Sequence, residues 1–282
     1  MTTISDRAVT EAAIDAAKAA GALARKAFLS FADGQPRRIE EKQGYFDIVT
    51  ETDRQAEAAA SEIIMARVPA SRILGEETGW RGEGDIVWYI DPIDGTSNFA
   101  SGLPFFCVSI GVFHTSGRPI CAVIHDPMRE ETFLAAEGQL SVNGVPARCK
   151  AGGTSDSRVE LLTNVPHEGS RPSAEQLARF ADLVENFRAV RRLGSCALQL
   201  AYVAAGRAAI GYDEKFSAWD VAAGFQLVAA GGGQLLAWDE NGNRIDDPLK
   251  NLEQARRFIV AASDYDVQTS ITLRHAAAIP AL

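Results

Sequence analysis

The chain has 282 residues, of which 46% are hydrophobic, and its formal net charge is −9. These values suit a folded protein with a large core, and they disfavour a disordered chain and a nucleic-acid-binding role, because an acidic surface repels nucleic acid. No run of about 18 apolar residues is present and acidic residues interrupt the N-terminal alanines, so we expect a cytoplasmic protein without a membrane span or a leader peptide.

The first 150 residues contain two helical patterns followed by several strand patterns. Apolar residues at helical spacing predict a helix from Ser5 to Phe28, which ends at a break over Asp33–Pro36. A second helix is predicted from Thr52, as its N-cap, to Arg67. Strands are predicted over residues 86–90, 105–113, 119–125 and 131–136, in an order that indicates an antiparallel meander, and Asn143-Gly144 predicts a tight turn.

The second half of the chain alternates strand and helix patterns. A change of composition at Lys150–Ser155 predicts a soft boundary between residues 1–150 and residues 151–282, and we expect the two halves to form one compact catalytic unit. Strands are predicted over 158–163, 189–192, 208–212, 234–238 and 257–261, and helices over 174–185, 195–205, 218–230 and the C-terminal tail. This mixture predicts an α/β or α+β fold.

Four acidic clusters lie at the ends of these elements, where chains expose reactive groups. They cover residues 47–53, 75–79 and 91–99 and the pair Trp219-Asp220 at a helix start. In the third cluster a buried strand delivers Asp91, and Pro92 is expected to end the strand, so that Asp94 can face the same point. Taken alone, this segment would also suit an ordinary polar turn. Taken with the other three clusters, it indicates a shared site.

The third cluster also offers further oxygen ligands and amide donors. The Ile93 carbonyl is expected to leave the sheet ladder, while Gly95 and Thr96 supply N–H groups at a predicted helix start, which suits a phosphate. Oxygen ligands without His or Cys favour Mg²⁺, Mn²⁺ or Ca²⁺ over zinc. An acidic protein that acts on a phosphate would need such ions to reverse the local field.

These segments resemble the motifs of the inositol monophosphatase family. The matching residues are Asp91-Pro92-Ile93-Asp94-Gly95-Thr96, Trp219-Asp220-Val221-Ala222-Ala223-Gly224, Gly75-Glu76-Glu77, and Asp47-Ile48-Val49-Thr50 with Asp53. Their order and spacing match the family over nearly the whole chain. The resemblance implies a layered α-β-α-β-α sandwich, the sugar-phosphatase fold shared with fructose-1,6-bisphosphatase, and a homodimer.

The resemblance also implies a set of metal ligands, two to three Mg²⁺ ions, and Mn²⁺ as an alternative. The implied ligands are Glu76, Asp91, the Ile93 carbonyl, Asp94 and Asp220. Glu76, Asp91 and the Ile93 carbonyl would bind one ion. Asp91, Asp94 and Asp220 would bind a second ion. Asp53 and Glu76 would lie near a third, more loosely held ion.

The mechanism implied by the resemblance is direct attack of a metal-activated water on the phosphate, without a phosphoenzyme. The Thr96 hydroxyl, paired with Asp53, would orient that water and help to remove its proton. The amides of Gly95 and Thr96 would stabilise the charge of the transition state. Lys42 matches a lysine near the site in relatives, and Glu77 is a candidate for supporting the ligands; each would equally suit a residue without a role in the site.

The expected substrate contacts lie in the second half of the chain. Ser195 and Cys196 occupy a segment whose backbone lies near the substrate hydroxyls in relatives. A glutamate that accepts ring hydroxyls in relatives aligns with Asp213, or with Glu214 after a shift of one residue. The neighbouring Lys215 would suit a second anionic group.

The resulting prediction is an enzyme that converts myo-inositol monophosphate, a small phosphorylated polyol, to inositol and phosphate. Alternatives with the same chemistry are histidinol-phosphate phosphatase, 3′(2′),5′-bisphosphate nucleotidase and fructose-1,6-bisphosphatase. An alternative of another class is a regulatory binding protein of this fold that acts with RNA polymerase or the ribosome. All the implied carboxylates are present, which favours an enzyme.

Overall fold

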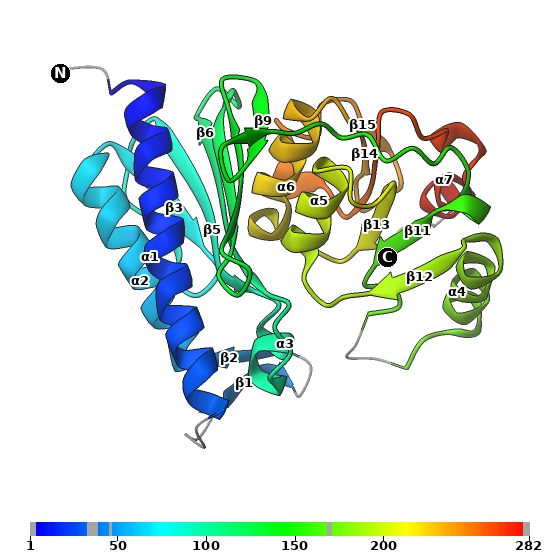
Figure 1. Ribbon diagram of the computed structural model, residues 1–282, viewed down its shortest axis with the longest axis horizontal. Coiled ribbons are helices and arrows are strands. Elements are labelled where there is room, and N and C mark those ends of the chain that lie inside the picture. The colour runs from blue at the N-terminus through cyan, green and yellow to red at the C-terminus, as the bar shows by residue number, and fades with distance from the viewer. Residues whose placement is uncertain (1–3, 33–38, 45–46, 168–170, 279–282) are drawn as a thin grey trace.

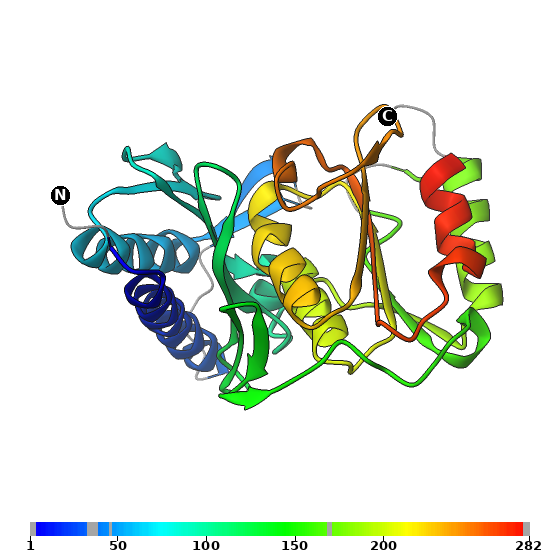
Figure 2. The same ribbon diagram turned by 90° about the horizontal axis from the view of Figure 1, so that it is seen from above.

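The chain folds into five layers (Figures 1 and 2). The computed structural model describes residues 4–32, 39–44, 47–167 and 171–278, without the side chains of residues 32, 39, 42–44, 47–49 and 278. The helical layers are α1 (Asp6–Ala32) with α2 (Glu51–Arg67), then α5 (Cys196–Ala204) with α6 (Ala218–Ala230), then α4 (Ala174–Asn186) with α7 (Ile271–Ala278). An eight-stranded and a six-stranded sheet separate them, so the predicted α-β-α-β-α sandwich is confirmed. None of the helices in these ranges is long and apolar enough to cross a membrane.

The eight-stranded sheet is formed by the first half of the chain, in the order β10-β9-β8-β7-β6-β5-β3-β4. Its strands are β3 (Ser71–Gly75), β4 (Gly79–Arg81), β5 (Ile86–Asp94), β6 (Cys107–His114), β7 (Pro119–Asp126), β8 (Glu131–Ala136), β9 (Gln139–Val142) and β10 (Val145–Pro146). Only β3 and β5 pair in parallel, and the predicted meander from β5 to β8 is confirmed. Asn143 and Gly144, with φ of 49° and 78°, form the predicted turn between β9 and β10.

The six-stranded sheet is formed by the second half, in the order β12-β11-β13-β16-β14-β15. Its strands are β11 (Glu160–Thr163), β12 (Ala189–Arg192), β13 (Ile210–Glu214), β14 (Gln234–Trp238), β15 (Arg244–Ile245) and β16 (Arg257–Ala261). β11 runs parallel to β12 and β13, and the other pairs are antiparallel. The short hairpin β1 (Ile39–Gly44) and β2 (Asp47–Thr50) leads into α2, and α3 (Thr96–Ser101) follows β5.

Two glycines allow close packing around α6, one against the eight-stranded sheet and one against α5. Gly111 in β6 faces Ala222 of α6, and a Cβ atom at Gly111 would lie 2.7 Å from the Ala222 Cβ. Gly224 of α6 packs against Leu200 of α5, where a Cβ would overlap the leucine side chain. One apolar core continues from β6 and β7 through both helices to β16. This packing places the first turn of α6, which carries Asp220, beside the end of β5. The boundary near residue 150 stays a prediction.

The structure corrects the predicted start of the second helix. Thr50, rather than Thr52, is the N-cap of α2, with extended backbone at φ −115° and ψ 162°. Asp53 at the third helical position accepts hydrogen bonds from the Thr50 N–H, at 2.9 Å, and from the Thr50 hydroxyl, at 2.5 Å. These two bonds tie Asp53 to the start of its own helix. The predicted break at Asp33–Pro36 lies outside the described residues.

The structure also corrects the predicted end of β5. The strand does not stop at Pro92 but continues to Asp94, with an irregularity in its pairing to β6. Asp91 pairs with Ser109 and Asp94 with Cys107. Between these two pairs β5 has one residue more than β6. Such a bulge accommodates a proline, which has no N–H for the ladder. Because side chains alternate along a regular strand, the extra residue is also what lets Asp91 and Asp94 face the same site.

Candidate metal centre and active site

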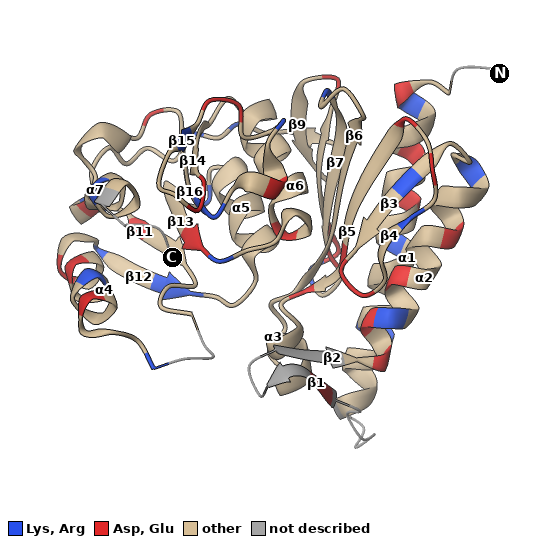
Figure 3. Cartoon of the chain, turned by 180° about the vertical axis from the view of Figure 1, so that it is seen from behind, with Lys and Arg blue, Asp and Glu red and all other residues tan. Residues whose placement is uncertain are grey.

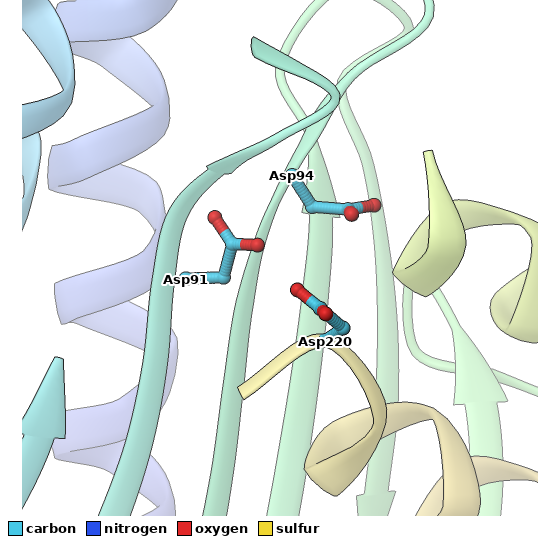
Figure 4. A group of neighbouring side chains, drawn as sticks. All are labelled: Asp91, Asp94 and Asp220. Carbon is cyan, nitrogen blue, oxygen red and sulfur yellow. The ribbon is translucent and has the colours of Figure 1, made fainter. Parts of the chain in front are cut away.

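Three aspartate side chains from β5 and α6 point toward one another (Figure 4). Asp91, Asp94 and Asp220 each offer a carboxylate oxygen, and these oxygens lie within 4.8 Å of one another. Asp91 and Asp94 are buried, and Asp220 is partly exposed. Asp220 is held by the Ser217 N–H, which donates to its Oδ2 at 2.6 Å. The structure therefore brings together the aspartates that the motifs predicted as a group.

The electrostatics of this cluster call for a cation. Burial raises the pKa of Asp91 well above its ordinary value, and the charges of Glu76, Asp94 and Asp220 raise that pKa further. The pKa of Asp220 is also raised, by burial and then by the charge of Asp94. Carboxylates this close in the interior must either bind protons or share a cation. Their oxygen-only donor set fits a hard divalent ion such as Mg²⁺ or Mn²⁺.

The N-terminus of α5 holds Asp94. The Ser195 hydroxyl donates to Asp94 Oδ2, the Cys196 N–H to Oδ1 at 3.1 Å and the Ala197 N–H to Oδ2 at 2.8 Å. These donors oppose the rise that burial causes in the pKa of Asp94. In the structure the donors of Ser195 and Cys196 serve Asp94, and their predicted contact with substrate stays a prediction. Cys196 also lines the adjoining pocket.

Glu76 and Glu77 lie in the turn between β3 and β4. The Glu76 N–H donates to the Ile90 carbonyl at 3.1 Å, which places this turn beside the last residues of β5. The charge of Glu76 is among the causes that raise the pKa of Asp91. Lys42 lies in β1, and its side chain is outside the described residues.

A residue that sequence reasoning missed anchors the Glu76 turn. Glu57 of α2 is fully buried, and its carboxylate accepts hydrogen bonds from the Glu77 N–H at 2.8 Å and from the Thr78 hydroxyl. A Cβ at Gly75 would overlap this carboxylate, so the close approach requires glycine there. Glu57 occurs at helical spacing in an otherwise ordinary amphipathic pattern. In the sequence, Glu57 differs from its neighbours only in being a charged residue on the face of α2 that packs Ala56 and Ala60 into the core.

Asp53 and Thr96 meet as the motifs predicted. The Thr96 hydroxyl lies 3.2 Å from Asp53 Oδ1 and 3.0 Å from the Ile93 carbonyl, and it can donate its single proton to one of them. Burial raises the pKa of Asp53 from 3.8 to about 6, against the hydrogen bonds from Thr50. Gly95, with φ 97°, is the left-handed residue at the start of α3. These residues place a hydroxyl and a weakly acidic carboxyl together next to Asp94.

A pocket of about 450 Å³ adjoins the cluster and is lined by residues from both halves of the chain. Asp94, Asp220 and Asp213 line it, and Glu214 does not. Glu214 is buried and accepts a hydrogen bond from the Tyr212 hydroxyl. Of the two predicted alternatives, Asp213 is therefore the one that faces the pocket.

His167 also lines this pocket, and sequence reasoning gave no reason to expect it there. Its Nε2 lies 2.8 Å from Asp213 Oδ1. The two residues are separated by the α4, β12 and α5 segments, so no local pattern connects them. Their contact depends on how the loop after β11 lies against the end of β13.

Comparison with known proteins places this arrangement in a family. The family model described as "Inositol monophosphatase family" matches residues 5–279. The chain belongs to the inositol monophosphatase family. It is therefore a member of a family of metal-dependent phosphatases, in keeping with the oxygen-rich cluster.

Individual relatives carry two kinds of name. The inositol-1-monophosphatase of Synechocystis is 37% identical over 209 residues, which cover 73% of this chain and 72% of the relative. The Nus factor SuhB of Escherichia coli is 38% identical over 226 residues, covering 78% and 82%. Among solved structures, the extragenic suppressor protein suhB from Bartonella henselae matches with a TM-score of 0.81 and 28% identity, covering 96% of this chain and 98% of that one.

Proposed function

We propose that this protein hydrolyses myo-inositol monophosphate to inositol and phosphate with Mg²⁺ as its cofactor, as a homodimer. The observation that carries the proposal is the buried cluster of Asp91, Asp94 and Asp220 beside a pocket of about 450 Å³. The pocket is large enough for a small phosphorylated polyol, and its polar lining suits hydroxyl groups. Family membership supports the phosphatase chemistry.

The metal ligands would be the oxygen donors that converge at the end of β5. They are Glu76, Asp91, the Ile93 carbonyl, Asp94 and Asp220, with Asp53 near a third ion, and Mn²⁺ would fit the same donors. Bound divalent ions would supply positive charge that offsets the phosphate and lowers the pKa of a nearby water. Ser195 and the α5 amides would keep Asp94 in place as these ions bind and leave.

Thr96 and Asp53 would handle the proton of the attacking water. The Thr96 hydroxyl can accept a hydrogen bond from that water while it donates its own proton toward Asp53. A carboxyl with a pKa of about 6 is mostly ionised at neutral pH and can take the proton. The Gly95 and Thr96 amides at the start of α3 would lie toward the phosphate.

Asp213 would orient the polyol. Its carboxylate faces the pocket and can accept hydrogen bonds from ring hydroxyls. Water attacks the phosphorus directly in this scheme, and the leaving alkoxide takes a proton from a water near Asp220. Hydrolysis in ¹⁸O-labelled water should therefore place one solvent oxygen in the released phosphate. Labelled oxygen in the inositol instead would show C–O cleavage and contradict direct attack at phosphorus.

A substrate panel tests the assignment. We expect purified protein with Mg²⁺ to release phosphate from myo-inositol 1-phosphate with a higher kcat/KM than from histidinol phosphate, fructose 1,6-bisphosphate or 3′-phosphoadenosine 5′-phosphate. A clear preference for one of the other three would replace the substrate and leave the chemistry intact.

A second candidate is a regulatory binding role, because several relatives at 38% identity are named Nus factor SuhB. Retention of the acidic cluster favours an enzyme. Stable co-purification with RNA polymerase, together with no phosphate release from any substrate in the panel, would favour the regulatory role.

A further inference from the structure

Asn164 lines the pocket, and no step of the hydrolytic scheme above uses it. It directly follows β11, which runs parallel to β13 with Leu162 opposite Gly211. Continuing this register by two residues places Asn164 opposite Asp213. Figure 3 shows the two strands side by side, with acidic residues in red at the end of β13. Opposite residues in neighbouring parallel strands lie about 5 Å apart and share a face of the sheet, so Asn164 and Asp213 are neighbours at the pocket.

The backbone fixes the orientation of the Asn164 amide. The Gly194 N–H donates to Asn164 Oδ1 at 2.9 Å, and Gln199 Nε2 donates to the same oxygen at 2.7 Å. Because a backbone N–H can only donate, the amide atom beside Gly194 is the oxygen. Among the residues that the structure describes, none accepts a hydrogen bond from Asn164 Nδ2. The nitrogen of this amide is therefore available as a donor to a molecule in the pocket.

A second asparagine holds the same peptide group from its other edge. Asn98 of α3 donates from Nδ2 to the Leu193 carbonyl at 2.7 Å and to the Phe105 carbonyl at 2.8 Å. The Leu193 carbonyl and the Gly194 N–H belong to one peptide group, which is trans, and the two bonds of a trans peptide point in opposite directions. This peptide is therefore held on both edges, and it gives the Asn164 amide a rigid support.

Asp213 keeps one carboxylate oxygen for a ligand. Its Oδ1 lies 2.8 Å from His167 Nε2 and accepts a hydrogen bond from the Glu214 N–H at 3.0 Å. In the described part of the chain no hydrogen bond reaches Asp213 Oδ2. A polyol hydroxyl that gives its proton to Oδ2 has only lone pairs left, and these need a donor. Asn164 Nδ2 is an uncharged donor in the neighbouring position.

We propose that Asn164 is a specificity-determining residue, whose Nδ2 donates a hydrogen bond to the substrate hydroxyl that gives its proton to Asp213. This inference rests on the proposed function and deepens it, because it names how an uncharged polyol is selected. An acceptor and a donor in neighbouring positions match a hydroxyl group, which both donates and accepts. A ring without hydroxyls is disfavoured, because it displaces water from both groups and gives neither a new partner.

Two esters, one with and one without ring hydroxyls, test the role of Asn164. We would measure kcat/KM with Mg²⁺ for myo-inositol 1-phosphate and for cyclohexyl phosphate, which share a six-membered carbon ring and one phosphate. The wild-type protein should prefer the inositol ester. Asn164→Asp keeps an acceptor for Gly194 and Gln199 but replaces the donor by a carboxylate oxygen, so this preference should fall roughly tenfold, as expected for one hydrogen bond. The added charge acts on the phosphate of both esters, so that effect cancels in the ratio.

Asn241→Asp is the matched control, because Asn241 is exposed between β14 and β15 and does not line the pocket. It makes the same chemical change and should leave the preference at the wild-type value. Asn164→Ala removes the whole amide and should also lose the preference, whereas a purely structural role would lower kcat/KM for both esters equally.

The outcomes separate this inference from the proposed function. A wild-type preference in an active Asn164→Asp protein would overturn the role of Asn164 alone. A wild-type protein that hydrolyses both esters equally well would overturn recognition of the hydroxyl by Asn164 and Asp213, and would leave the phosphatase chemistry in place. No phosphate release from either ester would overturn the proposed function and this inference together.

Discussion

Asp94 serves two purposes at the scale of a single residue. It belongs to the aspartate cluster, and it accepts hydrogen bonds from the Ser195 hydroxyl and two α5 amides. We expect Asp94→Asn to lose at least about a hundredfold in Mg²⁺-dependent turnover, because an amide is a poor replacement for an anionic ligand. The variant should stay folded, since the loss of one acceptor is partly offset by removal of a buried charge.

Turnover and thermal melting of Asp94→Asn, measured beside Asp182→Asn, check this prediction. Asp182 lies on α4 with a side chain that is 51% exposed, so its substitution makes the same chemical change away from the site. Wild-type turnover in a folded Asp94→Asn protein would remove Asp94 from the metal centre.

Thr96 offers a second test at this scale. Thr96→Val preserves the shape of the side chain and removes the hydroxyl that lies between Asp53 and the Ile93 carbonyl. We expect kcat to fall by about a hundredfold, the low end of the range for a general-base contact, while Thr96→Ser keeps most of the activity. Equal kcat values for the Val and Ser variants would show that the hydroxyl plays no part in proton transfer.

At the scale of elements, Glu57 links α2 to the turn that carries Glu76. Glu57→Gln places an amide N–H₂, which cannot accept, where one carboxylate oxygen stood, so either the Glu77 N–H or the Arg81 guanidinium, which lies 3.4 Å from Glu57 Oε1, loses its acceptor. We expect a loss of about 1–3 kcal/mol in the free energy of unfolding and a several-fold rise in the Mg²⁺ concentration needed for half-maximal activity.

The control for Glu57→Gln is Glu62→Gln, on the same helix but exposed. Both variants would be measured by thermal melting and by Mg²⁺ titration of activity and of intrinsic fluorescence. A Glu57→Gln protein that is destabilised but keeps the wild-type Mg²⁺ requirement would limit Glu57 to a structural role.

Elements with a strong hydrophobic pattern could be predicted from the sequence. The geometry of the site also depends on strand pairing and on contacts between distant segments, which such patterns do not contain. The ends of β8, β12, α6, β14 and β16 agree with the predicted ranges. In α6 and β14 the reason is an apolar run bounded by turn residues. The sequence did not predict the bulge at Pro92, because a proline usually ends a strand. Only the pairing with β6 shows that the strand continues. The contact of His167 with Asp213 was missed because it joins distant segments.

At the scale of the whole molecule, the acidic centre should make the stability of the protein depend on pH. The pKa of Asp53 is raised to about 6, and those of Asp91, Asp94 and Asp220 are also raised, mainly by burial. An acid whose pKa is higher in the folded state binds more protons there than in the unfolded chain. The stability of the metal-free protein therefore decreases as pH rises from about 4 through these folded-state values, by about 3 kcal/mol from Asp53 alone.

The difference between Tm in Mg²⁺ and Tm in EDTA isolates this effect, because groups far from the site contribute equally to both. Cations bind the ionised carboxylates, so the difference should grow by several degrees between pH 5 and pH 8. A difference that stays constant or shrinks over this range would show that the aspartate cluster is not where Mg²⁺ acts.

The most direct test of the account is phosphate release from myo-inositol 1-phosphate by metal-stripped protein before and after addition of Mg²⁺. The buried aspartate cluster predicts no turnover above background in EDTA and full turnover once Mg²⁺ is restored, with Asp220→Asn inactive under both conditions. Turnover that persists in EDTA, or that Asp220→Asn retains, would contradict a metal-dependent phosphatase site at Asp91, Asp94 and Asp220.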